Sequence, residues 1–190
     1  IPSLLLACTL ASGADRSALD QWGNFSRSPE SKKLTAWLRG NAEAILEKKS
    51  PDITPPPGLP GLYGRAGMFI TLVRKGRVRG CYGAFYHDLT LTAEIFLSYL
   101  EGALYRDPRY RPIEPSELAD TEIIVTVTSY PEPVDDLNKI DISSCGVFIE
   151  CDESPGTVIV PAEFRTTSVI AGLAGKSDCR YSRFRAVTIR

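Results

Sequence analysis

The chain has 190 residues, of which 43% are hydrophobic and 24% charged, a composition typical of a globular protein and not of a disordered one. The formal net charge of −1 excludes a molecule that attracts nucleic acid through its overall charge. The charges are unevenly distributed. Residues 112–163 carry twelve acidic side chains and one basic one, whereas residues 165–190 carry six basic and one acidic. This segregation indicates either two solvated faces or a local anion site.

The N-terminal stretch, residues 1–27, is interpreted as a leader or extension ahead of a single domain at residues 28–190. Within "IPSLLLACTLASGA", "LLAC" is similar to a lipoprotein cleavage box at Cys8, and "ASGA" to an ordinary signal cleavage site. The alternative is a short apolar helix packed on the domain. We expect an exported or envelope-associated protein if residues 1–14 are a truncated signal, and a cytoplasmic one otherwise. Residues 15–27 are expected to be irregular, and no apolar run is long enough to span a membrane.

Two amphipathic helices are predicted. The first begins at Ser28 as N-cap with Pro29 at the first helical position, and its apolar face continues to about Lys48. The second covers residues 92–105 and ends at "RDPRYRP", where proline disfavours helix. A short third helix is expected near residues 167–174.

Strands account for most of the remaining chain. After a proline-rich connector at residues 50–62, "GMFITLVRKGRVRGCYGAF" predicts a hairpin with strands at 68–73 and 78–85. "TEIIVTVTSY" is a strand, "CGVFIEC" and "TVIV" form a second hairpin around "DESPG", and "RFRAVTI" ends the chain. This order predicts an α+β fold with a mixed, largely antiparallel sheet and flanking helices.

The five cysteines show no metal-ligand spacing. They include no CxxC pair, and His87 is the single histidine, so we expect neither a zinc site nor another metal or cofactor. Cys145 and Cys151 flank the second hairpin, where they either approach each other or remain buried thiols.

The stretch "RVRGCYGAF" places a cysteine between two glycines in a strand. Alternation along a strand would point Arg79, Cys81 and Gly83 the same way, and a guanidinium beside a thiol favours the nucleophilic thiolate. Gly80 and Gly83 would let a ligand or another backbone come close. The alternative is a buried structural thiol.

These segments together resemble the AMMECR-one domain family. Its signature contains "GVFVTL" and "LRGCIGTF", and "LTLTAEIFLSYLEGALYRDPRYRPIEPSEL", "TEIIVTVTSYPEPV", "CGVFIE" and "VIVPAEF" match later family segments in order, so that the likeness covers about residues 31–190. The resemblance implies a two-lobed α+β fold with a cleft beside the RGC motif and an activity that is unsettled. It also implies a modification pathway shared with Memo-like and radical SAM proteins.

Further candidate residues lie near this motif. Asp107, Arg109 and Tyr110 match the family's "DPRF" turn; Asp107 would orient Arg79 or act as a general base, or the turn would only end a helix with a surface ion pair. His87 is either a base for Cys81 or a solvent-facing loop residue. Glu163 lies where the second hairpin would border the cleft.

Three functions remain open, and whether the protein is an enzyme is uncertain. In the first, Cys81 is a nucleophile, Arg79 holds its charge and Asp107 or His87 moves a proton. The second is a non-catalytic module that binds a nucleotide, RNA or small anion, with Gly80, Gly83, Arg109 and Tyr110 at the ligand. Its binding surface would comprise three tyrosines and a basic group, namely Tyr82, Tyr105, Tyr110, Arg74, Lys75, Arg77, Arg79, Arg106, Arg109 and Arg111. The third is an accessory protein that presents substrate to a Memo-like or radical SAM partner.

Overall fold

A computed structural model describes residues 13–61, 66–87, 92–137, 140–152, 154–163 and 179–190. The helices are α1 (Gly13–Ser26), α2 (Glu30–Leu46), α3 (Thr92–Tyr105), α4 (Pro115–Leu118) and the 3-10 turn η2 (Pro161–Glu163). The strands are β1 (Gly67–Arg74), β2 (Arg77–Ala84), β3 (Thr121–Thr128), β4 (Glu132–Pro133), β5 (Cys145–Cys151), β6 (Ser154–Ile159) and β7 (Cys179–Ile189).

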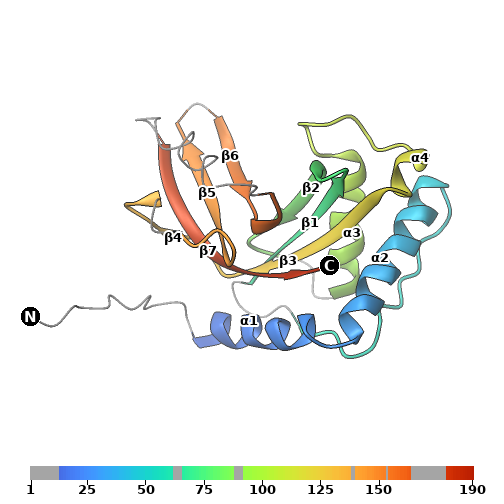
Figure 1. Ribbon diagram of the computed structural model, residues 1–190, viewed down its shortest axis with the longest axis horizontal. Helices are drawn as coiled ribbons and strands as arrows, with labels where there is room; N and C mark the ends of the chain where they lie inside the picture. The colour runs from blue at the N-terminus through green and yellow to red at the C-terminus, as the bar shows by residue number, and fades with distance from the viewer. Residues whose placement is uncertain (1–12, 62–65, 88–91, 138–139, 153, 164–178) are drawn as a thin grey trace, which may run out of the picture.

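The strands form one sheet in the order β2-β1-β3-β7-β5-β6, with β4 paired to β7, and every pairing between them is antiparallel. The long strand β7 belongs to both halves of this sheet. Residues 186–189 pair with β3, and the preceding residues pair with β4 and β5 (Figure 1). The predicted α+β fold with a largely antiparallel sheet and flanking helices is confirmed.

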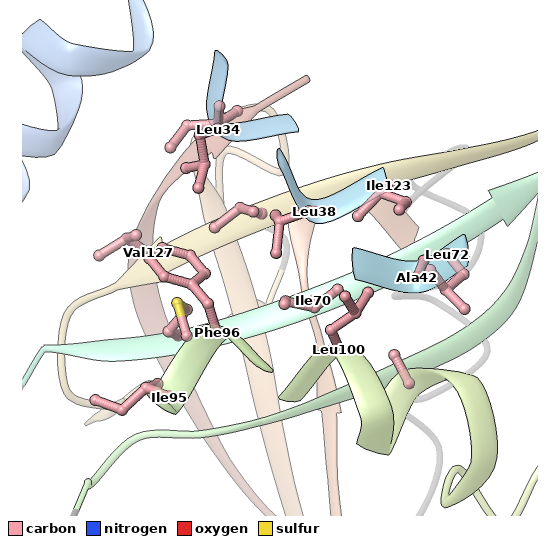
Figure 2. Close-up of a cluster of buried hydrophobic side chains, with 14 of the residues drawn as sticks. Leu34, Leu38, Ala42, Ile70, Leu72, Ile95, Phe96, Leu100, Ile123 and Val127 are labelled. Atoms are coloured by element: carbon pink, nitrogen blue, oxygen red, sulfur yellow. The ribbon is translucent and has the colours of Figure 1, made fainter. Parts of the chain in front are cut away.

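The helices cover one face of the β1–β3 half of the sheet. The predicted apolar positions of α2 and α3 meet there, because both helices repeat them every three or four residues. Figure 2 shows side chains from α2, α3, β1 and β3 converging in one cluster. Its fully buried members include Leu34, Leu38, Ile70, Phe96, Leu100 and Val127.

The stretch before α2 is helical, so the prediction that residues 15–27 are irregular is wrong. Helix α1 packs Leu19, Trp22 and Phe25 into the same core cluster as α2 and α3. Trp22 is fully buried, its ring meets Phe96 edge-on, and its Nε1 donates to the carbonyl of Gly61. Burial of the Trp22 indole against the other helices stabilises α1, although its apolar residues show only weak helical periodicity in the sequence. The leader interpretation of residues 1–14 falls mostly outside the described residues.

Helix α2 begins one residue later than predicted. Ser28 does not cap it; the Ser28 hydroxyl donates to the Phe25 carbonyl and therefore completes the end of α1 instead. The N-cap is Pro29, which makes no side-chain hydrogen bond to the helix. Among the described residues, no helix has the length and apolar character needed to cross a membrane.

The first hairpin contains a β-bulge that the sequence did not predict. Lys75 and Gly76 form its two-residue turn with φ of 48° and 68°, the left-handed geometry that matches strand twist. Val78 faces Val73, but Gly80 faces Leu72, so Arg79 has no counterpart on β1. The extra residue interrupts the alternation of side chains between Arg79 and Cys81.

The second half of the sheet contains a disulfide between Cys151 and Cys179. These residues are register partners on β5 and β7, which brings their Cα atoms to 4.1 Å. Neither alternative stated for Cys145 and Cys151 holds for both residues: they lie at opposite ends of β5, so they do not approach each other, and Cys151 is bonded to Cys179 instead of remaining a thiol. Strand β6 begins at Ser154, within the segment predicted as turn. The helix predicted near residues 167–174 lies outside the described residues.

Helix α3 packs closely on β2 at Gly80. A Cβ atom there would collide with the carbonyl of Ala103 on α3, whereas a Cβ at Gly40 on α2 would meet nothing within 4 Å. We expect Gly80→Ala to lower the free energy of unfolding by about 1–3 kcal/mol, because helix and strand must separate. Gly40→Ala is the matched control and should raise it by about 1 kcal/mol through helix propensity. Chemical denaturation of both variants measures this, and equal effects would contradict the assigned packing.

Candidate functional site

Asp107 organises the candidate site from the turn after α3. Its carboxylate accepts a hydrogen bond from the backbone N–H of Cys81 at 2.8 Å, which occupies a donor at the open edge of β2. It also accepts from the backbone N–H of Arg109 at 3.0 Å and pairs with the Arg109 guanidinium, with Nη2 at 2.9 Å from Oδ2. The side chain of Asp107 is 3% exposed. The alternative of a surface ion pair therefore does not describe Asp107: its carboxylate is buried and joins the turn after α3 to strand β2.

Burial by itself would raise the pKa of Asp107, but the hydrogen bonds outweigh it. The guanidinium and N–H of Arg109 and the N–H of Cys81 all stabilise the carboxylate, and the pKa is lowered from its usual value. Its partnership with Asp107 raises the pKa of Arg109 further above its already high value. Asp107 is thus a fixed anion, and this weakens the prediction that it serves as a general base.

Cys81 lies on the face of β2 that points away from the helices. It faces Thr71 across the hairpin, and Thr71 Oγ1 lies 3.3 Å from Cys81 Sγ. The half-buried thiol packs against an apolar cluster that includes Phe69, Val160 and Phe184. Cys81 therefore has an apolar environment, in contrast to the cationic one expected from its sequence neighbours.

This environment disfavours the thiolate form of Cys81. Burial raises the pKa of Cys81 to about 12, the negative charge of Glu163 acts in the same direction, and Thr71 and Arg109 lower it only in part. A thiol with this pKa is neutral near pH 7, and the nucleophilic form is scarce. The resting protein thus holds Cys81 as a thiol.

Glu163 comes to the site from the second half of the sheet, in the turn η2 after β6. Its Oε1 lies 3.2 Å from Arg109 Nη1, and its Oε2 accepts a hydrogen bond from the Val160 N–H at 3.0 Å. The side chain is 6% exposed, and this burial raises the pKa of Glu163 despite the attraction of Arg109. A carboxyl of this kind can exchange a proton closer to neutral pH than an ordinary glutamate.

Arg79 lies away from the Cys81 sulfur, so the predicted geometry of a guanidinium beside the thiolate is wrong. Its Nε and Nη2 donate to Glu117 at 3.0 and 2.9 Å, and its terminal nitrogens also donate to the carbonyls of Arg111 and Pro112. The bulge at Arg79 is the physical reason, because it breaks the alternation that would have placed both side chains on one face.

Glu117 is a structural centre that the sequence reasoning missed. Its carboxylate contacts Arg74, Arg79 and Arg111 at 3.0, 2.9 and 3.4 Å, and its side chain is 7% exposed. Hydrogen bonds from Arg79 are the main cause that lowers the pKa of Glu117 to about 2. The signal was present in "EPSE", because Glu114 and Glu117 form a capping box around Pro115 at the start of α4.

The two glycines of the motif are explained by packing and not by a ligand. Gly80 makes room for the α3 backbone, and a Cβ at Gly83 would collide with the backbone of β1 and the ring of Phe69. The ligand-binding interpretation of both glycines therefore loses its original reason. Tyr110 is half-buried, and the Arg109 guanidinium lies 5.5 Å from its ring centre.

His87 belongs to a different environment from Cys81. Its Nδ1 lies 2.9 Å from the hydroxyl of Tyr99, a residue of α3 that packs on the helix-side core. The imidazole is half-buried, and burial lowers its pKa. Cys81 packs in the apolar cluster on the other face of the sheet, so this arrangement does not support His87 as its base.

The described residues contain no group of three or more His, Cys, Asp or Glu side chains placed to hold a metal ion. What the site does bring together is one fixed ion pair, Asp107–Arg109, and two acidic groups of raised pKa, Cys81 and Glu163. The arrangement can donate or accept a proton at Glu163. Arg109, with 43% of its side chain exposed, is open to contact from solvent.

Alkylation of Cys81 tests the electrostatics of the site. Mass spectrometry of the peptide that contains Cys81 measures the rate of alkylation as a function of pH. The profile should show a thiol pKa far above that of an ordinary cysteine, and the rate near pH 8 should be more than about a hundredfold lower than that of an ordinary cysteine. Glu163→Gln removes the negative charge and should raise the alkaline rate severalfold. The exposed Glu150→Gln is the control and should change nothing. An ordinary pH profile in the wild type would refute the buried neutral thiol.

Acid titration tests the Glu117 cluster. A pKa lowered on folding adds stability above the unfolded value, and this stability is lost as the pH falls towards about 2. Because the arginines are partly exposed, we expect a contribution of about 1–2 kcal/mol, less than the shift would give without solvent screening. Unfolding of Glu117→Gln should depend less on pH below about 5 than unfolding of the wild type, while Glu150→Gln should follow the wild type. Parallel curves for Glu117→Gln and the wild type would contradict the cluster's role.

Comparison with known proteins identifies the family of the chain. The AMMECR1 family model matches residues 36–188. The curated relatives include proteins of Methanosarcina acetivorans, 36% identical over 48% of this chain and 49% of the relative, and Thermococcus gammatolerans, 29% identical over 76% and 72%. In the first of these the match spans about half of the relative's length.

A solved structure supports the fold independently. The crystal structure of an uncharacterised protein from Pyrococcus horikoshii superposes with a TM-score of 0.60, at 22% identity, over 88% of this chain and 90% of that one. The resemblance inferred from the RGC stretch is therefore confirmed by a match across most of the chain. The chain belongs to the AMMECR1 family.

Proposed function

We propose that the protein is an enzyme, or an accessory to one, that works at the Cys81 site by proton transfer through Glu163. The observation that carries the proposal is the placement of two acidic groups with raised pKa, the half-buried thiol of Cys81 and the buried carboxyl of Glu163, beside the fixed Asp107–Arg109 pair. Perturbed titratable groups gathered in this way are characteristic of sites where protons are moved.

Each residue has a role in this proposal. Glu163 accepts or donates the proton, and Arg109 contacts the substrate from its exposed side while Asp107 holds it in place. Cys81 meets the substrate as a neutral thiol. It becomes a nucleophile only if a bound cationic substrate lowers its pKa and Glu163 accepts the thiol proton, because burial keeps the free thiol protonated. Arg79 stabilises the strand through Glu117 and takes no part in the chemistry.

The accessory form of the proposal uses the same site differently. The chain would hold a substrate at Cys81 within a modification pathway, and a Memo-like or radical SAM partner, as the family resemblance implies, would carry out the reaction. Replacement of Glu163 or Cys81 would then impair turnover only when the partner is present.

The test compares metabolite mixtures incubated with the wild type, Glu163→Gln, Cys81→Ser and the control Glu150→Gln. A compound consumed by the wild type and by the control should persist with Glu163→Gln, with a rate about a hundredfold lower. Repetition with purified partner proteins separates the enzymatic from the accessory form. Turnover that survives in a folded Glu163→Gln protein would refute the proposal.

The alternative is a non-catalytic module that binds a small ligand at the same residues. The exposed Arg109, stacked near Tyr110, is the observation that favours it. In that case mass spectrometry would detect a compound retained by the wild type and lost from Arg109→Gln, with no product formed.

A further inference from the structure

A second region of the protein is open to solvent and rich in cations. The end of the β1–β2 hairpin forms a pocket of about 480 Å³ lined by Arg74, Lys75, Arg77, Val78 and Arg79. The pocket begins at the left-handed turn of Lys75 and Gly76. It does not include any residue assigned above to proton transfer.

The pocket carries more positive than negative charge. Two of its cations are fixed: Arg79 is held by Glu117, and Arg74 by both Glu117 and Asp120, with its Nε 2.6 Å from Asp120 Oδ1. The side chain of Lys75 is 76% exposed, with its amine 3.8 Å from Asp120.

Arg77 is an exposed residue of the pocket lining, and it forms no ion pair with another described residue. Four cations therefore face two carboxylates, in a protein whose net charge is −1. This surplus of two positive charges is local and does not follow from the overall composition.

We propose that this pocket binds the phosphate group of a small molecule. Arginines held in place by carboxylates are preorganised donors, and guanidinium groups match the geometry of phosphate oxygens. Val78 and the methylene stems of the cations provide an apolar wall for the rest of the ligand. The volume lies within the range of small-molecule sites.

The surroundings favour one compact phosphate over a nucleic-acid strand. Asp120 lies beside Arg74 and Lys75, so negative charge borders the pocket. An extended backbone would have to pass this carboxylate, whereas a terminal phosphate would not. The proposal is independent of the proton-transfer function proposed for Cys81.

Calorimetric titration with pyrophosphate, AMP and a short single-stranded oligouridine tests the site. The double variant Lys75→Asn/Arg77→Gln removes both exposed cations, and asparagine tolerates the left-handed backbone at position 75. Arg180→Gln is the matched control, because Arg180 is an exposed arginine on β7, in the other half of the sheet. Thermal unfolding establishes that each variant is folded.

We expect pyrophosphate and AMP to bind the wild type, more weakly as salt is added, and the double variant to lose about tenfold or more in affinity. Arg180→Gln should remain within about twofold of the wild type. The NMR chemical shifts of the backbone amides of Gly76 and Val78 should change on binding. The proposal is refuted by an equal loss in Arg180→Gln, by unchanged affinity in the double variant, or by binding of the oligouridine without binding of either small phosphate.

Discussion

The hydrogen bond from the Cys81 backbone N–H to Asp107 is the interaction on which the candidate site depends. It occupies a donor at the open edge of β2, where an uncapped strand would invite pairing with another chain. The same carboxylate fixes Arg109, and Arg109 reaches Glu163 in the turn after β6, the strand at the other end of the sheet order. One buried carboxylate thus links residues from both halves of the sheet at the thiol.

The bulge at Arg79 separates two electrostatic environments that a regular strand would have merged. On one side, three arginines stabilise the charge of Glu117 and lower its pKa. On the other, burial dominates and raises the pKa of both Cys81 and Glu163. The carboxylate that Arg79 contacts and the thiol two residues later therefore have pKa values shifted in opposite directions.

Local patterns of apolar residues in the sequence determined much of the architecture. Helical spacing of apolar residues located α3 with its observed bounds and α2 within two residues, and β-branched alternation located β1, β2, β3 and most of β7. These signals are local, because the backbone of each element and its buried face follow from residues a few positions apart. The RGC stretch and the segments that match in order after it were sufficient to indicate the family.

Only the tertiary structure decided which side chains meet. Arg79 precedes Cys81 by two residues, yet a single extra residue in β2 turns it to Glu117, and Asp107 takes the place beside the strand. Glu163 is far from Cys81 in sequence and reaches the site through the second hairpin and η2. Helix α1 and the Cys151–Cys179 disulfide were missed for the same reason. Burial and pKa depend on contacts between distant segments, and the local pattern of residues does not contain them.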